Sequence, residues 1–136
     1  MEKKVAVCTA DAAEMGGPYS QAITHNGLIF LSGQGAVDPC TNQVRTGTIE
    51  QETRLAIENI RIIMAAAGAS LSNILQITAY LVDIREYGRF NEVYEKYFHQ
   101  NHPARTCVQV DKLPFGLRVE IDGIGFVGSR SGAQNS

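Results

Sequence analysis

The order of secondary-structure signals along this chain predicts an α+β fold, with one mixed β-sheet and two helices packed on one of its faces. Short β-branched or apolar runs alternate with two segments of helical periodicity, in the order strand, two strands, helix, strand, helix, two strands. The helices stand singly between strands, and a hairpin signal joins two of the short runs. Since no third helix remains to cover the other face of the sheet, we expect the protein to self-associate.

The N-terminal part of the chain contains the hairpin. Strands are expected at residues 4–9, 21–25 and 28–32. Asn26-Gly27 separates the second strand from the third, and this dipeptide favours a two-residue hairpin turn. Residues 15–18 (Met-Gly-Gly-Pro) are expected as a turn, and residues 38–47, which begin with Asp-Pro, as a loop.

The first helix is expected to begin at Thr48. Gln51 lies three residues further on, which is the capping-box pattern. Apolar residues then recur at helical spacing, namely Ala56, Ile60, Ile63 and Ala67. Gly68 follows them and favours the end of the helix there.

The second helix is expected between two further strands. Residues 74–82 are β-branched and apolar and predict a strand, after which Asp83 and Glu86 resemble a helix cap. The apolar stripe of this helix is Phe90, Val93, Tyr94 and Tyr97. Pro103 lies beyond its end, and the last two strands are expected at residues 106–110 and 117–127.

Composition describes one ordinary globular domain. The 136 residues fit a single domain, expected over residues 1–128, and the small polar segment 129–136 is expected to be a disordered tail. The formal net charge of −2 gives no reason to expect nucleic acid or an acidic membrane surface as a partner. No apolar run approaches the roughly 18 residues of a membrane-spanning helix, so no membrane association is expected.

Cysteine and histidine usage gives no metal or disulfide signal. The three cysteines are far apart and form no CxxC pair, and no histidine forms a spaced cluster with Cys or Asp. We therefore expect no metal. The sequence also contains no P-loop motif, and no other cofactor is expected. The free thiols suit a reducing compartment, that is the cytoplasm, or an organelle in a eukaryotic source.

Two charged residues within strand-like runs are the first candidates for chemistry. Arg105 offers a planar fork of donors suited to a carboxylate or a phosphate. Glu120 lies between Val119 and Ile121, so alternation directs it, with Arg118 and Asp122, to the face opposite those two residues. The alternatives are a structural ion pair for Arg105 and a solvated sheet face for Glu120.

Other candidates are less specific. Cys107 shares a strand face with Arg105, but a cysteine in a strand is usually part of a core, so its backbone is the better candidate for ligand contact. Tyr19 offers an aromatic wall with a hydroxyl, and Gly33 allows close approach of a backbone N–H to a ligand. Ordinary turn chemistry is the alternative for the segments that carry these two residues.

Taken together, these segments resemble the RidA (YjgF/YER057c/UK114) family of reactive-intermediate deaminases. The resemblance extends from about Thr9 to Phe126. Its carrying segments are residues 17–22 (Gly-Pro-Tyr-Ser-Gln-Ala), 31–34 (Leu-Ser-Gly-Gln), 38–39, 58–60, 67–68, 91–94 (Asn-Glu-Val-Tyr), 103–110 (Pro-Ala-Arg-Thr-Cys-Val-Gln-Val), 113–114 and 119–121 (Val-Glu-Ile). Their order and spacing are more specific than any single segment.

The resemblance implies a chorismate-mutase-like fold (Bacillus type) and a homotrimer with a central barrel and sites between subunits. It also implies hydrolysis of small 2-imino acids to 2-oxo acids and ammonia. Arg105 matches the arginine that binds the substrate carboxylate, and Glu120 matches the glutamate that holds the attacking water. Pocket-lining positions are matched by Tyr19, Ser32, Gly33, Asn91 and Cys107.

The departures from the family pattern are small. Residues 15–17 (Met-Gly-Gly) stand where one small residue often precedes Gly-Pro, which is expected to alter the pocket rim. Gly123 and Gly125 replace alanine-type residues and are expected to loosen the last strand slightly. Two rival functions stay open: an RNA-cleaving translation inhibitor, and a non-catalytic chaperone or ligand-sensing trimer.

Overall fold

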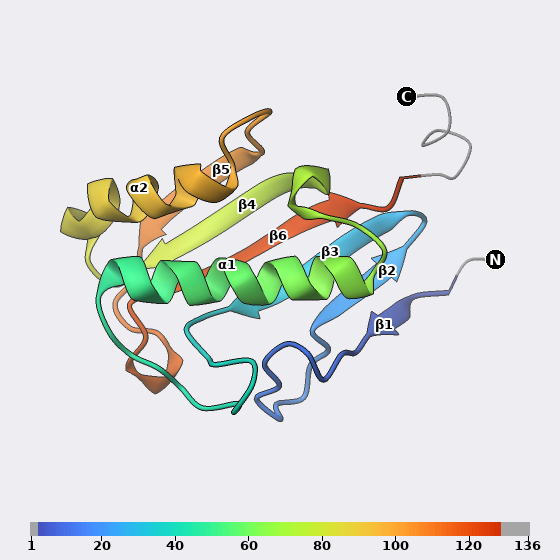
Figure 1. The fold of residues 1–136 in the computed structure, drawn as a ribbon, viewed down its shortest axis with the longest axis horizontal. Coiled ribbons are helices and arrows are strands. Elements are labelled where there is room, and N and C mark those ends of the chain that lie inside the picture. The colour runs from blue at the N-terminus through green and yellow to red at the C-terminus, as the bar shows by residue number, and fades with distance from the viewer. Residues whose placement is uncertain (1–2, 129–136) are drawn as a thin grey trace.

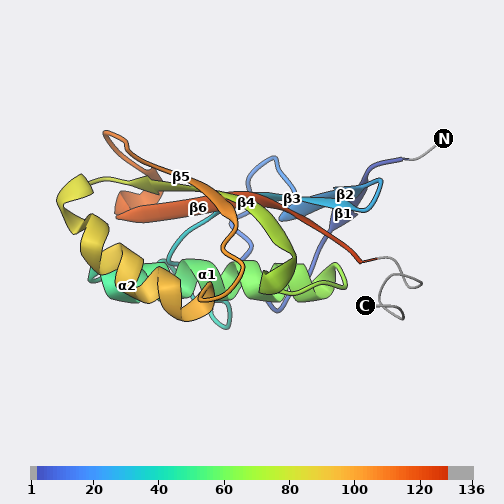
Figure 2. The same cartoon turned by 90° about the horizontal axis from the view of Figure 1, so that it is seen from above.

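The computed structural model describes residues 3–128, in which six strands form one mixed sheet. The strand order is β1-β2-β3-β6-β4-β5, and Figures 1 and 2 show both long helices on the same side of the sheet. The elements are β1 (Val5–Val7), β2 (Ala22–His25), β3 (Leu28–Gln34), α1 (Ile49–Ala66), η1 (Leu71–Asn73), β4 (Ile74–Leu81), η2 (Ile84–Glu86), α2 (Tyr87–Tyr97), β5 (Ala104–Gln109), η3 (Pro114–Gly116) and β6 (Val119–Phe126). The predicted element order and α+β class are confirmed. The predicted tail, 129–136, lies outside the described residues.

Two local predictions are confirmed at atomic level. Asn26 and Gly27 both have positive φ, 51° and 78°, as a type I′ hairpin turn requires between the antiparallel strands β2 and β3. At the start of α1 the capping box is complete, because Thr48 Oγ1 accepts from the Gln51 N–H at 3.2 Å and Gln51 Oε1 accepts from the Thr48 N–H at 3.0 Å. Gly68, with a φ of 84°, follows the last turn of the helix.

The start of α2 differs from the prediction. Asp83 does act as a cap, accepting from the Arg85 N–H at 3.0 Å, but it caps the short 3-10 turn η2. The α-helix begins only at Tyr87. The side chain of Glu86 pairs with Arg118 and Arg89 instead of completing a capping box, which explains the displaced start.

The two faces of the sheet have different environments. On the helix side, apolar residues of α1 and α2 pack against alternate residues of the central strands, with Ile57, Met64, Ile77, Phe90 and Ile121 all 0% exposed. On the opposite side the described chain has no covering helix (Figure 2). Large apolar side chains remain exposed there, among them Phe30 of β3 and Val108 of β5.

Gly123 lies at a place of close approach between β6 and β4. A Cβ built on it would lie 2.5 Å from the backbone oxygen of Gln76. The expectation that this glycine merely loosens the strand is therefore incomplete, because a side chain at this position would push β4 and β6 apart.

Candidate active site

Arg105 lies on β5, an edge strand of the sheet, and points to the helix side. Its parallel register partner on β4 is the buried Ile77, and its guanidinium carbon lies over three aromatic rings of α2. The distances to the ring centroids of Tyr87, Phe90 and Tyr94 are 5.6, 5.6 and 4.7 Å. These residues and Asn91 recur at helical spacing, so one face of α2 surrounds the guanidinium.

The polar contacts of Arg105 are with neutral groups. Its Nη1 donates to Asn91 Oδ1 at 2.8 Å, and its Nη2 donates to Tyr87 Oη at 2.9 Å. No carboxylate of residues 3–128 lies within ion-pair distance of it, whereas Arg45, Arg61, Arg85, Arg89 and Arg118 each have an acidic partner. Residues 3–128 therefore provide Arg105 with no ion pair, which does not favour its interpretation as a structural ion pair within the chain. An oriented, partly buried cation with no counter-ion among these residues is suited to bind an anion.

A small cavity adjoins the guanidinium. It has a volume of about 320 Å³ and is lined by Asn91, Tyr94, Glu95, His102, Pro103 and Arg105. Burial raises the pKa of Tyr94, and the positive charge of Arg105 opposes that effect. The predicted contact of Asn91 with this region is thus direct, through its hydrogen bond to Arg105.

Cys107 lies two residues after Arg105 on the same face, as expected. Its side chain packs against the hydrophobic core. Burial raises the pKa of its thiol, so the thiolate is disfavoured at neutral pH. The thiol is therefore disfavoured as a nucleophile, and contact of the Cys107 backbone with a ligand stays a prediction.

Glu120 lies on β6 and points to the open face, since its neighbours Val119 and Ile121 are both 0% exposed in the core. Burial is the main cause that raises its carboxyl pKa, and the nearby negative charge of Asp122 adds to it. Asp122 accepts from the hydroxyl of Tyr80 at 2.9 Å. Glu120 is thus a half-buried carboxylate with an increased tendency to hold a proton.

Gly33 of β3 lies directly against the carboxyl group of Glu120. A Cβ at position 33 would lie 2.8 Å from Glu120 Cδ and 3.0 Å from Cγ, which is too close for carbon contacts. The absence of a side chain at Gly33 therefore leaves room for the carboxylate and exposes the strand backbone beside it.

Gly33 and Glu120 both line a second cavity of about 410 Å³, which is larger than the cavity at Arg105. Tyr19, Met15, Leu117 and Phe115 also line it, among others. The Ser32 hydroxyl donates to the backbone oxygen of Ser20, which fixes the loop carrying Tyr19 to the end of β3. The structure thus brings Tyr19, Gly33 and Glu120 together, with Ser32 supporting them.

Arg105 and Glu120 do not meet within one chain. Tyr80 of β4 is the register partner of both Glu120 in β6 and Val108 in β5. The backbones of Glu120 and Val108 are therefore two strand spacings, about 10 Å, apart. However, Arg105 points to the helix side and Glu120 to the open side. One chain therefore carries two half-sites, a cation site at Arg105 and a carboxylate site at Glu120.

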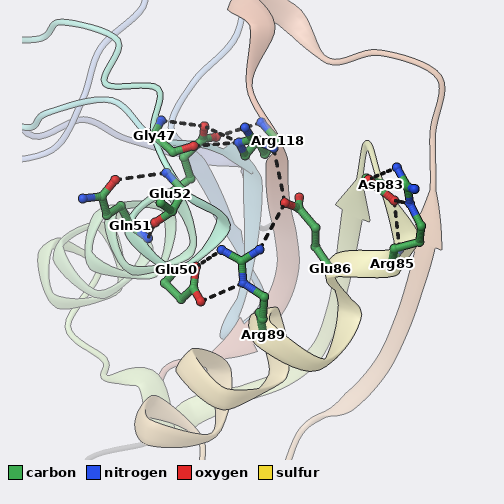
Figure 3. Close-up of polar contacts among 10 residues, drawn as sticks. Gly47, Glu50, Gln51, Glu52, Asp83, Arg85, Glu86, Arg89 and Arg118 are labelled. Carbon is green, nitrogen blue, oxygen red and sulfur yellow. Dashed lines mark hydrogen bonds and ion pairs between the residues drawn. The ribbon is translucent and has the colours of Figure 1, made fainter.

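Arg118 was expected on the face of Glu120, and this expectation is wrong. It precedes the first residue of β6, and its side chain turns toward the N-termini of the helices (Figure 3). There its Nε donates to the Gly47 oxygen at 2.6 Å and its Nη1 donates to Glu86 at 3.2 Å. The fully buried Glu52 accepts from the backbone N–H groups of Gly47 and Arg118, at 3.1 and 2.8 Å. This network fixes the segment that enters β6.

Two buried amides that support the larger cavity had no assigned role at the sequence level. Asn59 of α1 accepts from the Ala13 N–H at 2.9 Å and donates to the Val37 oxygen at 2.8 Å. Gln21 donates to the backbone oxygens of Thr9 and Ala13, at 3.1 and 3.0 Å. A polar residue beside the apolar stripe of α1 was the available signal for Asn59.

Within residues 3–128, no group of three or more His, Cys, Asp and Glu side chains is placed to hold a metal ion. None of the described helices combines the length and the apolar character that crossing a membrane requires.

Comparison with known sequences shows the family of this fold. The family described as Endoribonuclease L-PSP matches residues 9–127. A RutC family protein of Pyrococcus horikoshii is 40% identical over 123 residues, covering 90% of this chain and 98% of the relative. A human protein named 2-iminobutanoate/2-iminopropanoate deaminase is 38% identical over 122 residues, covering 90% of this chain and 89% of the relative.

Solved structures agree with this result. The crystal structure of yeast YEO7 superposes on this protein with a TM-score of 0.89 at 36% identity, and the match covers 93% of this chain and 100% of the yeast chain. E. coli TdcF with bound serine gives a TM-score of 0.86 at 32% identity, covering 91% of this chain and 99% of that chain. The chain therefore belongs to the Endoribonuclease L-PSP family, which includes RidA (YjgF), and the predicted family is confirmed.

Proposed function

We propose that this protein hydrolyses small 2-imino acids, such as 2-iminobutanoate and 2-iminopropanoate, to 2-oxo acids and ammonia. The observation that carries this proposal is the state of Arg105, an oriented guanidinium with aromatic and neutral oxygen partners and no carboxylate of residues 3–128 within ion-pair distance. Such a group is prepared to bind the carboxylate of a substrate. The name of the human relative and the serine bound to E. coli TdcF support a small carboxylate ligand.

Glu120 supplies the second requirement, which is a base for water. In the proposed mechanism, Arg105 binds the substrate carboxylate and fixes C2 next to a water molecule held by Glu120. The water oxygen bonds to C2, the π electrons of the C=N bond move to nitrogen, and Glu120 takes the proton. Glu120 returns this proton to nitrogen, which gives the neutral carbinolamine. Glu120 then takes the proton of the new hydroxyl group and passes it to the amino nitrogen, so that the C–N bond breaks, the C=O bond forms and ammonia leaves.

The reaction as proposed needs two chains, because the half-sites of one chain face opposite sides of its sheet. We propose that the open face of one subunit receives the β5 edge of the next in a homotrimer, so that Glu120 of one chain meets Arg105 of another. The exposed Phe30 and Val108 on the open face and its edge favour such an assembly. A raised pKa of Glu120 in the single chain suits a general base that works near neutral pH.

A partition assay tests the proposed activity. Threonine dehydratase generates 2-iminobutanoate in the presence of semicarbazide, and the added protein should reduce formation of the semicarbazone. Arg105→Ala should remove this effect. Arg85→Ala is the matched control, because Arg85 is exposed and its ion pair is with the neighbouring Asp83. Equal activity of Arg105→Ala and the wild type would refute the mechanism.

The same preparations separate the rival functions. In a non-catalytic carboxylate sensor, neither the wild type nor Glu120→Gln would change the semicarbazone yield. For an RNA-cleaving protein, we would expect cleavage of RNA that depends on salt concentration, although the formal net charge of −2 does not favour binding to phosphates.

A further inference from the structure

We propose that the hydroxyl of Tyr87 is a second donor to the substrate carboxylate, beside Arg105. This inference rests on the proposed function, since it assigns a further binding residue to the same site. Neither the segments that carry the family resemblance nor the predicted pocket residues include Tyr87.

The contacts of Tyr87 define what its hydroxyl can do. Tyr87 Oη accepts from Arg105 Nη2 at 2.9 Å, so one of its lone pairs is used. The hydroxyl hydrogen has no acceptor among residues 3–128 and is free to donate. Because Tyr87 is 40% exposed, this donor is on the accessible side of the site.

The geometry at Arg105 separates an inner and an outer edge of the guanidinium. The inner contact, to Asn91, is partly buried, whereas the outer contact, to Tyr87, is exposed. A ligand arriving from solvent therefore meets the edge with Nη2 and Tyr87 Oη first. A carboxylate there can accept one bond from the guanidinium and one from the phenol, as its two oxygens allow.

The two donors also reinforce each other. A phenol that accepts from a cation becomes a better donor, because hydrogen bonds in a chain polarise one another. The Tyr87 ring lies 5.6 Å from the guanidinium carbon, so it contributes to holding Arg105 independently of its hydroxyl. Tyr87→Phe therefore removes the donor and keeps the ring.

The test is the binding of 2-oxobutanoate, the product expected from 2-iminobutanoate, measured by calorimetry. We expect Tyr87→Phe to raise the Kd about 5- to 30-fold, the loss of one hydrogen bond to a charged group at a partly exposed site. In imine hydrolysis KM should rise by a similar factor with little change in kcat, since the contact exists before and during the reaction.

The matched control is Tyr97→Phe. Tyr97 lies on the same helix, and its hydroxyl interacts with Glu58, away from Arg105. We expect this variant to bind 2-oxobutanoate like the wild type. A crystal structure of ligand-free Tyr87→Phe shows whether the Arg105 guanidinium has kept its position and its hydrogen bond to Asn91.

The outcomes are distinct. A raised Kd with Arg105 unmoved and still bonded to Asn91 supports direct donation by Tyr87. An unchanged Kd, a raised Kd with a displaced Arg105, or no binding by the wild type overturns it. If the wild type binds 2-oxobutanoate in a Tyr87-dependent way but hydrolyses no imine, the proposed function fails while the carboxylate contact stands.

Discussion

Gly33→Ala is the perturbation for which the structure gives the sharpest expectation. The new Cβ would lie 2.8 Å from Glu120 Cδ, whereas carbon atoms in contact are about 3.5–4.0 Å apart. The carboxylate must therefore move by about 1 Å. A misplacement of this size can cost about 100-fold in rate, equivalent to about 2.7 kcal/mol of transition-state stabilisation.

Folding should tolerate this change. The atoms that collide belong to the flexible end of a side chain next to a cavity, and Gly33 does not have a positive φ. We expect the free energy of unfolding to change by less than about 1 kcal/mol. The assay is kcat/KM for 2-iminobutanoate hydrolysis, together with urea denaturation of the same preparation.

Gly123→Ala is the control, because it is expected to lower the stability of the fold, which Gly33→Ala should leave nearly unchanged. Its methyl group would meet the backbone oxygen of Gln76 at 2.5 Å, so two strands must separate, at a cost of about 1–3 kcal/mol. Near-normal kcat/KM in folded Gly33→Ala would show that the position of the Glu120 carboxylate does not matter, and the reasoning about this site would fail.

Three further predictions concern stability and titration. Asn59→Ala should lower the free energy of unfolding by about 2–4 kcal/mol in urea, because buried backbone groups lose their partners. Burial raises the pKa of the Glu120 carboxyl group. The contribution of this group to stability is therefore present below pH 4.5, its ordinary pKa, and is lost as pH rises through the raised pKa. Activity needs the ionised carboxylate and should rise over the same pH range. Asp122→Asn should move the acidic limb of kcat/KM to lower pH, and an unmoved limb would contradict the assignment. Arg89 holds the pKa of Glu50 at about 2. The contribution of Glu50 to stability is therefore present above its ordinary pKa of 4.5 and is lost as pH falls through about 2. If the Glu50 carboxyl signal of Arg89→Ala still titrates near 2 by NMR, Arg89 is not the cause.

Local signals explain why most of the fold could be predicted. Asn26-Gly27 and the Thr48–Gln51 capping box act within a few residues, so their sequence pattern is sufficient. The start of α2 was misplaced because Glu86 pairs with Arg89, three residues later in the chain, and with Arg118, which is distant in sequence. A cap pattern does not show such competition.

The site could be predicted only in its parts. Alternation around Glu120 correctly directs it away from the core, but it failed for Arg118, which lies just before the strand. Nor does alternation relate the face of Arg105 to that of Glu120, because the two residues belong to different strands whose register only the folded sheet defines. The aromatic surroundings of Arg105 likewise depend on how α2 packs on β5.

The placement of Arg105 and Glu120 on opposite faces has a genetic consequence. A chain that has lost Arg105 still offers an intact Glu120 to one neighbour, and a chain that has lost Glu120 still offers an intact Arg105 to another. In the proposed trimers, unfolding and refolding a mixture of the two inactive variants would therefore restore wild-type pairs at about a quarter of the interfaces. Two inactive alleles of the same gene, one without Arg105 and one without Glu120, would then complement each other, because the sheet presents these two residues on different sides.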